Sequence, residues 1–202
     1  SMIMILEFLE EKMMPFAAKI ANQRHLAAIK DGIIVTLPFI IAGSVFLILA
    51  NLPIPAITKF YLTDTGQIIK KWLSYPVGVT FDLIAVITCL GIAYRLSESY
   101  KLDGISGAIL GLVSFLLVTP FVINFTHEKF GQLTAAGIPT SLTGSSGLFV
   151  AIIMAILSTE IFNFIVKKDL VIKMPDMVPP AVSKSFAALI PGFFIISAAL
   201  II

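Results

Sequence analysis

The most constraining feature of this sequence is a stretch without any charged side chain, residues 32–50. A helix that crosses the roughly 30 Å of hydrocarbon in a bilayer needs about 20 mostly apolar residues. The whole chain is similarly apolar, since 58% of its 202 residues are hydrophobic and only 13% are charged, and its mean hydropathy is +1.01. A soluble domain carries roughly 25% charged residues. The sequence therefore predicts an all-α integral membrane protein whose surface is covered by lipid.

Four more apolar stretches bring the expected number of membrane spans to about five. The spans are expected at about 30–51, 77–96, 104–125, 147–166 and 185–202. Residues 56–76 are expected to form a mixed connector with interfacial lysine and aromatic anchors. Residues 126–146 are rich in Gly, Ser and Thr and are expected to form a loop, with a small hairpin around Gly137. The last span is still apolar at Ile202, so we expect a chain truncated in or just after a span.

The N-terminal residues 2–20 follow a different pattern. Glu7, Glu10 and Glu11 fall on another side of the helical wheel from the apolar positions, and Pro15 is a candidate bend. The apolar positions recur at helical spacing: Met2, Leu6, Leu9, Met13, Phe16 and Ile20. This segment is too charged to span a bilayer. We expect an amphipathic helix that lies on the membrane surface.

Basic residues are distributed unequally between the two sides of the expected spans. One side holds ten of them: Lys12, Lys19, Arg24, Lys30, Arg95, Lys101, Lys167, Lys168, Lys173 and Lys184. The other side holds four: Lys59, Lys70, Lys71 and Lys129. Because cytoplasmic loops carry an excess of Lys and Arg, we expect the N-terminus and the 167–184 loop in the cytoplasm. With five spans, the C-terminus would point outward.

Several classes of function are not indicated by the sequence. The net charge of +2 is small and no basic stripe is present, so no nucleic-acid partner is expected. Cys89 is the single cysteine, and His25 and His127 have no metal-ligand spacing around them. None of the common phosphate-loop, metalloprotease or nucleophile-elbow motifs occurs. We therefore assign no catalytic residue, metal or cofactor.

Two features inside the spans are candidates for function. Glu160 is the acid lying well within a span, and an intramembrane carboxylate is a functional candidate by default. The alternative is that it lies near the cytoplasmic end of its span, where it snorkels or pairs with a neighbouring helix. Small residues in the third span allow close helix approach, either between two chains or within one. They are Gly104, Gly107, Gly111 and Ser114.

The 167–184 loop is a candidate docking surface. Its prolines restrict the backbone and lower the entropy lost on docking. Its basic residues suit an acidic cytoplasmic partner or anionic lipid. The candidate residues are Lys167, Lys168, Lys173, Pro179, Pro180 and Lys184. The alternative is an ordinary solvated loop on the positive side of the membrane.

Several segments together resemble the sugar-transporting IIC components of the bacterial phosphotransferase system, in the lactose/cellobiose/diacetylchitobiose branch. They are residues 8–12 (FLEEK), 15–20 (PFAAKI), 23–26 (QRHL), 29–32 (IKDG), 37–44 (LPFIIAGS) and 174–186 (MPDMVPPAVSKSF). The resemblance runs through essentially the whole chain. Members of this family are about twice as long, with about ten spans.

The resemblance implies that residues 1–202 are the N-terminal scaffold half, which forms a homodimer interface. The sugar pocket and the reactive residues belong to the second half, so no substrate-binding or catalytic position is carried over. The implied function is uptake and phosphorylation of a β-linked disaccharide of the cellobiose or diacetylchitobiose type at the bacterial cell membrane. The chain would thus be a subunit of a sugar phosphotransferase, with a cytoplasmic phosphorylated IIB protein as its partner.

Two other interpretations are kept. One is a membrane module whose role is self-association, which the small-residue helix allows. The other is half of an unrelated secondary transporter, which would show self-similarity between spans. The five uneven spans show no such repeat.

Overall fold

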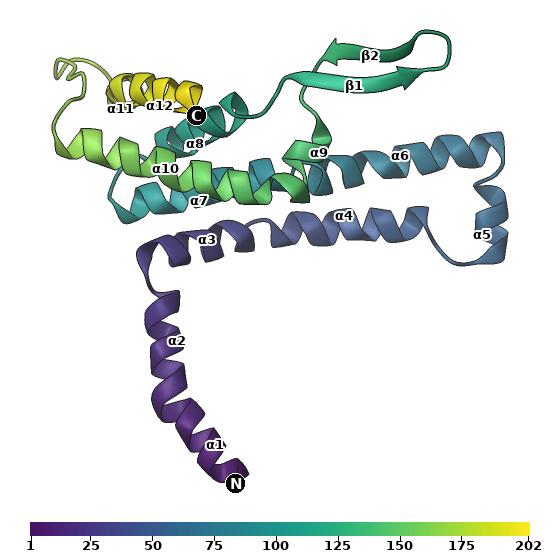
Figure 1. The fold of residues 1–202 in the computed structure, drawn as a ribbon, viewed down its shortest axis with the longest axis horizontal. Helices are drawn as coiled ribbons and strands as arrows, with labels where there is room; N and C mark the ends of the chain where they lie inside the picture. Colours follow the sequence, from purple (N-terminus) through teal and green to yellow (C-terminus); the bar gives the residue numbers. More distant parts are fainter.

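The computed structural model describes residues 1–202, which fold into a bundle of apolar helices with one projecting arm and one small hairpin (Figure 1). The N-terminal elements are α1 (Met2–Phe8), the π-helical turn η1 (Leu9–Met13), α2 (Met14–Ala21), α3 (Arg24–Ile34), α4 (Leu37–Ala50), α5 (Pro55–Phe60), α6 (Asp64–Phe81) and α7 (Ile84–Ser99). The remaining elements are α8 (Gly104–Leu117), β1 (Val122–His127), β2 (Gly131–Ala136), α9 (Thr140–Thr143), η2 (Ser145–Gly147), α10 (Leu148–Lys167), α11 (Pro180–Ala187) and α12 (Leu189–Ile201).

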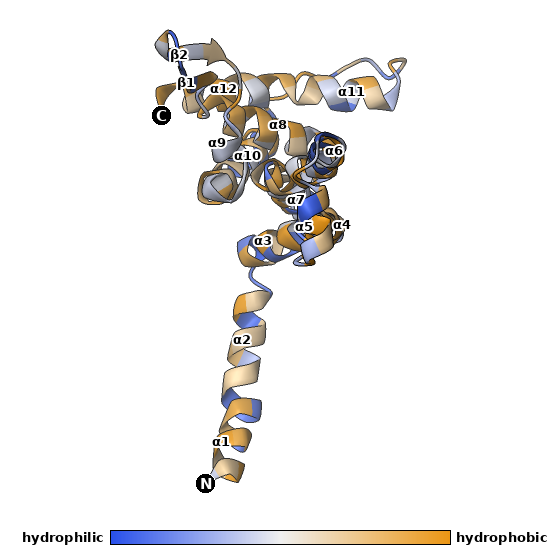
Figure 2. Ribbon diagram, turned by 90° about the vertical axis from the view of Figure 1, so that its right-hand side faces the viewer, coloured by the Kyte–Doolittle hydropathy of each residue, from blue (hydrophilic) through white to orange (hydrophobic).

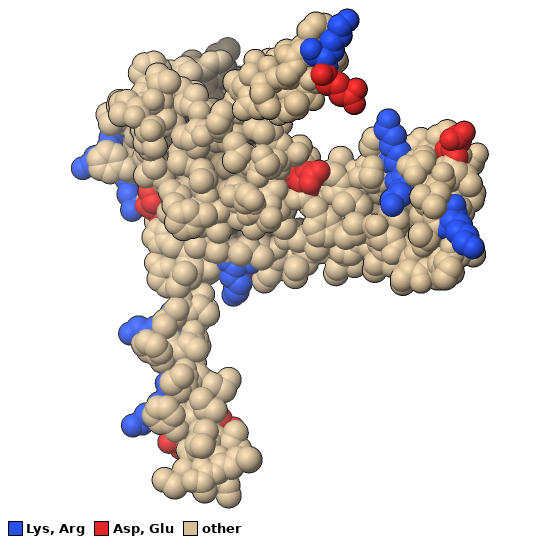
Figure 3. Space-filling view, turned by 45° about the vertical axis from the view of Figure 1, so that its right-hand side comes forward, with Lys and Arg blue, Asp and Glu red and all other residues tan.

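The expected five apolar helices are present. Four helical stretches are long and apolar enough to cross a membrane, namely Arg24–Ala50, Asp64–Ser99, Ser145–Lys167 and Pro180–Ile201. The shorter helix α8 is the fifth. On the face shown in Figure 3, most of the surface between the two ends of the bundle is uncharged. The fold is thus that of an integral membrane protein.

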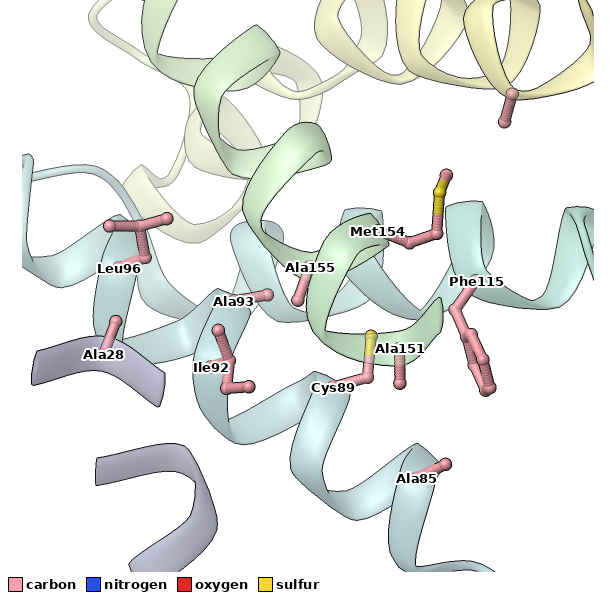
Figure 4. Packing of buried hydrophobic residues seen from close by; sticks show 11 residues of the cluster. Ala28, Ala85, Cys89, Ile92, Ala93, Leu96, Phe115, Ala151, Met154 and Ala155 are labelled. Atoms are coloured by element: carbon pink, nitrogen blue, oxygen red, sulfur yellow. The ribbon is translucent and has the colours of Figure 1, made fainter. Parts of the chain in front are cut away.

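Helix α7 lies at the centre of the packing, because it contacts α3, α8 and α10 (Figure 1). The main core cluster has eleven members, and six of them are alanines: Ala28, Ala85, Ala93, Ala151, Ala155 and Ala199. Figure 4 shows Cys89 and Ala93 of α7 directed towards Ala151 and Ala155 of α10. Small side chains let helix backbones approach closely, which is how helices associate in lipid.

The small residues of α8 face α7 of the same chain. A Cβ added at Gly107 would collide with the Ser97 hydroxyl, and one at Gly111 would lie 2.7 Å from the Ala93 Cβ. The Ser114 hydroxyl is buried and donates to the Gly111 carbonyl at 2.8 Å. The structure therefore uses these positions for packing within one chain. Gly104 likewise lies against the Tyr94 ring.

Two predicted boundaries near the α5 end of the molecule are wrong. Residues 56–76 are helical, in α5 and α6, where a mixed connector was expected. The Thr63 hydroxyl accepts a hydrogen bond from the Gly66 backbone N–H at 3.0 Å and so caps α6, a side-chain signal that a search for apolar runs misses. The helical path continues to Ser99 with a break at residues 82–83. The observed helical stretch Asp64–Ser99 therefore extends beyond both ends of the span predicted at 77–96.

The third span ends earlier than expected. Helix α8 stops at Leu117, and the following residues, expected within the 104–125 span, form strand β1. Pro120 cannot donate to a helix, and β-branched residues follow it. A hairpin is present as predicted, but Gly137 follows its second strand. The turn lies at residues 128–130, and Gly131 has a φ of +71°.

Proline also divides the first and last spans. The helix predicted for 30–51 starts at Arg24 and breaks between Ile34 and Leu37, just before Pro38. The span predicted for 185–202 starts at Pro180, and its helix is interrupted at Ala188, before Pro191. A proline removes a backbone donor and clashes with the preceding turn, which explains both breaks. Span four fits its expected bounds, as α10.

The N-terminal segment is helical to Ala21, as expected, with a π-helical turn just before Pro15. Helices α1 and α2 form an arm that leaves the bundle roughly perpendicular to α3 and α4 (Figure 1). Its side chains are exposed, and apolar and polar residues both occur along it (Figure 2). An arm across the direction of the spans is the geometry of a helix in the plane of a membrane surface.

The glycine packing gives a first test. We expect Gly107→Ala to lower the stability of the detergent-solubilised chain by about 1–3 kcal/mol, because the new methyl group overpacks the α7–α8 contact. Gly78→Ala is the matched control, since its Cβ would meet only Asp82 Oδ2 at 3.6 Å. The control should be neutral or slightly stabilising. Thermal unfolding of both variants checks this, and equal melting temperatures would contradict it.

Candidate functional site

The start of α3, the end of α7, the start of α8 and the end of α10 gather at one end of the bundle, on the left in Figure 1. Helices α7 and α10 both finish here in Schellman turns. The Leu102 N–H bonds to the Ser97 carbonyl, and the Leu170 N–H to the Ile165 carbonyl, each at 2.9–3.1 Å. The left-handed residue of each turn is not glycine but Lys101, with φ of 60°, and Asp169, with φ of 59°.

Glu160 forms the centre of a polar network at this end. Its Oε1 atom accepts a hydrogen bond from His25 Nε2 at 2.6 Å and another, short one from the Tyr100 hydroxyl. These partners come from α3 and from the C-terminal end of α7. The Glu160 and His25 side chains are each about one-third exposed, at 36% and 35%. Glu160 thus pairs with neighbouring helices near the end of its span.

The orientation of His25 is fixed from the N-cap of α3. Gln23 Oε1 accepts a hydrogen bond from the Leu26 backbone N–H at 2.9 Å, so the other side of this amide carries its NH₂ group. That NH₂ group lies 2.8 Å from His25 Nδ1 and donates to it. The proton of the imidazole is then on Nε2, which faces Glu160. The N-cap of α3, the tautomer of His25 and the hydrogen bond from His25 to Glu160 of α10 are therefore linked through Gln23.

Two cations approach the Tyr100 ring. Arg24 Cζ lies 4.2 Å and Lys167 Nζ 5.6 Å from the ring centroid, both within range of a cation–π contact. Partial burial of Tyr100 raises the pKa of its phenol above 10.0, and the hydrogen bond to Glu160 raises this pKa further. The nearby Arg24 guanidinium opposes this shift. The phenol consequently remains a donor over the physiological pH range.

The other predicted loop residues are spread over this end of the molecule. Lys168 Nζ lies 5.7 Å from the Phe164 ring centroid, and Lys173 Nζ lies 2.9 Å from Asp169 Oδ2. Pro179 and Pro180 begin α11, as its N-cap and first residue. Lys184 lines a cavity of about 450 Å³, together with residues of both charges: Glu98, Lys101 and Asp103.

The sequence alone did not reveal that Glu160 pairs with His25 and Tyr100. These residues are separated from it by 135 and 60 positions along the chain. A signal was present in the charge count, because His25, Tyr100 and Glu160 all lie close to segments placed on the same side of the membrane. The Glu160 network can join α3, α7 and α10, and it places Arg24 and Lys167 at the ends of these helices. No three His, Cys, Asp or Glu side chains come together to hold a metal ion.

Comparison with known proteins identifies relatives over most of the chain. Residues 30–202 match the family described as Phosphotransferase system, EIIC. The lichenan permease IIC component of Bacillus subtilis (strain 168) is 51% identical over 94% of this chain and 42% of its own length. The cellobiose-specific EIIC component of Geobacillus stearothermophilus is 50% identical over 93% of this chain and 42% of its own length.

A solved structure is similar as well. The crystal structure of ChbC, the IIC component of the N,N'-diacetylchitobiose-specific phosphotransferase system, superimposes with a TM-score of 0.87 at 49% identity. The match covers 96% of this chain and 45% of ChbC. The chain therefore spans less than half the length of the relatives it matches.

Tyr100 should make stability depend on alkaline pH. A phenol whose pKa is raised on folding contributes stability that is present below pH 10.0 and is lost as the pH rises through the higher pKa of the folded state. We expect Tyr100→Phe to lower the melting temperature at pH 8, and this difference to shrink above pH 10.

Tyr75→Phe is the control, because Tyr75 is 56% exposed and donates no hydrogen bond to a carboxylate. Melting curves from pH 7 to 11 measure the effect. A difference between wild type and Tyr100→Phe that does not change with pH would contradict the role assigned to the phenol.

Proposed function

Since the chain belongs to the phosphotransferase system EIIC family, we propose that residues 1–202 are the N-terminal scaffold half of a membrane component that takes up and phosphorylates a sugar. The observation that carries this proposal is the match of nearly the whole chain to less than half of ChbC. In a protein of that length, these five apolar helices supply a fixed frame for a second, substrate-handling half.

We infer that the sugar is a β-linked disaccharide of the cellobiose or diacetylchitobiose type. The support is that relatives about 50% identical to this chain are named for cellobiose, lichenan and N,N'-diacetylchitobiose. In the reaction proposed for the full-length transporter, a phosphoryl group passes from a cytoplasmic EIIB protein to a sugar hydroxyl, which loses its proton. The charge of the product makes its return through the bilayer costly, so it is retained in the cell.

We propose that the N-terminus is cytoplasmic. The bundle end with Arg24, Lys101 and the 167–184 segment contains most of the basic residues, as counted from the sequence. The opposite end holds Lys59, Lys70 and the hairpin turn (Figures 1 and 3). The excess of Lys and Arg at the first end is typical of a cytoplasmic face.

We also propose that two copies of the chain associate. The β1–β2 hairpin is a candidate contact, because an isolated two-stranded hairpin is only marginally stable. One of its faces is apolar and exposed, with Ile123 at 37% and Phe125 at 43% exposure. A second copy would cover that face.

The dimer has a direct test. Light scattering of the detergent-solubilised chain should give a protein mass of twice 21.8 kDa. Phe125→Glu should shift this mass towards a single chain, because a carboxylate on the apolar face opposes its burial. Asn124→Glu is the matched control, since successive strand residues point to opposite faces. A single-chain mass for the wild type, or two copies for both variants, would contradict the proposed contact.

The basic end is proposed to receive the EIIB partner. Lys168 and Lys173 lie in the connection between α10 and α11, Lys184 lies in α11, and Pro179 and Pro180 begin that helix. Lys167 belongs to the same predicted set but lies over Tyr100. Positive charge at this surface would steer an acidic partner face to the scaffold.

Charge reversal tests this docking surface in the full-length transporter. We expect replacement of Lys168, Lys173 and Lys184 by Glu to raise the KM for phosphorylated EIIB about tenfold or more, with little change in kcat. The control reverses Lys59, Lys70 and Lys71 at the other end. The measurement is phosphorylation of labelled cellobiose or diacetylchitobiose by membrane vesicles at several EIIB concentrations. Equal KM values for the two triple variants would exclude this surface.

A further inference from the structure

Two cations that approach the same aromatic ring at the basic end lack a carboxylate partner. Arg24 and Lys167 both approach the Tyr100 ring, from α3 and from the end of α10. Neither has an Asp or Glu oxygen within 4.0 Å, because the carboxylates that have a lysine or arginine within that distance are Glu98, paired with Arg95, and Asp169, paired with Lys173. Arg24 interacts with the Tyr100 side chain, and Lys167 makes no side-chain hydrogen bond.

Glu160, the acid that contacts Tyr100, does not balance this pair. Oε1 of Glu160 already accepts hydrogen bonds from His25 and Tyr100, and one carboxylate facing two cations leaves an excess of positive charge. The situation differs on the other flank of Arg24. A cavity of about 650 Å³ there is lined by Arg95 but also by Asp31 and Glu98. The uncompensated charge is therefore on the Tyr100 side.

The surroundings of this pair are those of a membrane interface. Arg24 follows the arm of α1 and α2, which leaves the bundle across the direction of the spans (Figure 2). Apolar side chains of α2, the part of the arm that precedes Arg24 in the chain, are exposed, with Phe16 at 62% and Ile20 at 44%. Tyrosine, arginine and lysine at the end of apolar helices are typical of the head-group level.

We propose that Arg24 and Lys167, which both lie against the Tyr100 ring, bind the phosphodiester group of an anionic phospholipid of the adjacent leaflet. An arginine fork and a lysine ammonium together suit a phosphate that carries one negative charge. The apolar side chains of the arm lie beside the acyl chains of the same lipid, which a soluble anion would not require. This site goes beyond the proposed transport function and depends on neither the sugar nor EIIB.

Native mass spectrometry of the chain in a neutral detergent tests the site. The probe is phosphatidylglycerol, compared with phosphatidylcholine of the same acyl chains. We expect the first phosphatidylglycerol to bind more tightly than phosphatidylcholine. Arg24→Gln and Lys167→Gln should each weaken its binding roughly fivefold, and Arg24→Lys should weaken it less than Arg24→Gln, because the charge stays while the guanidinium fork is lost. Lys167 makes no side-chain hydrogen bond, so its variant carries the test if Arg24→Gln does not fold.

Lys173→Gln is the matched control, because it removes a lysine on the same side that is already paired with Asp169. Its phosphatidylglycerol affinity should equal that of the wild type. Equal binding of both lipids, or equal affinity in the control and the Lys167 variant, would overturn the proposal. Inorganic phosphate is added in a separate arm, and displacement of the lipid by millimolar phosphate would overturn the lipid assignment in favour of a soluble anion.

Discussion

Close approach of helix backbones along α7 is the constraint on which the rest of the structure depends. In lipid, apolar side chains gain little by leaving one apolar surrounding for another, so helices are held by van der Waals packing. Alanines of α7 and α10, and Gly107 of α8 against Ser97, permit that packing. Because α3, α8 and α10 all rest on α7, a larger residue at one of these contacts would displace the helix ends as well. The Glu160 network exists only while those ends stay aligned.

The sequence predicted the features that depend on composition over long stretches and missed those that depend on single residues. Uncharged runs of about 20 residues have few alternatives to a membrane span, so the number and order of the apolar helices could be predicted. The end of α8 before Pro120 and the cap of α6 at Thr63 are local events. Apolar periodicity averages over such events. It therefore predicts a helix where β1 begins and a connector where α5 and α6 lie.

The candidate site was predictable only in part, for a different reason. The charge count correctly grouped the segments around Arg24, Lys101 and Lys167 at one end. It could not show that Glu160 meets His25 and Tyr100, because these contacts depend on how the helices are rotated and staggered. An acid in a membrane helix is costly unless it is paired. That cost predicts a partner for Glu160, and the fold supplies two hydrogen-bond donors at the helix end.

Gln23 connects this network to the N-terminal arm. The same side chain caps α3 through its oxygen and sets the tautomer of His25 through its nitrogen. It also lies between the end of α2 and the start of α3, where the arm turns away from the bundle (Figure 1). A change in the direction of the arm therefore disturbs the cap, then the imidazole, and then the contact with Glu160 on α10. An arm held in the plane of a membrane surface would fix that direction, and would thereby support the alignment of α3 with α10 at the end where the basic residues are gathered.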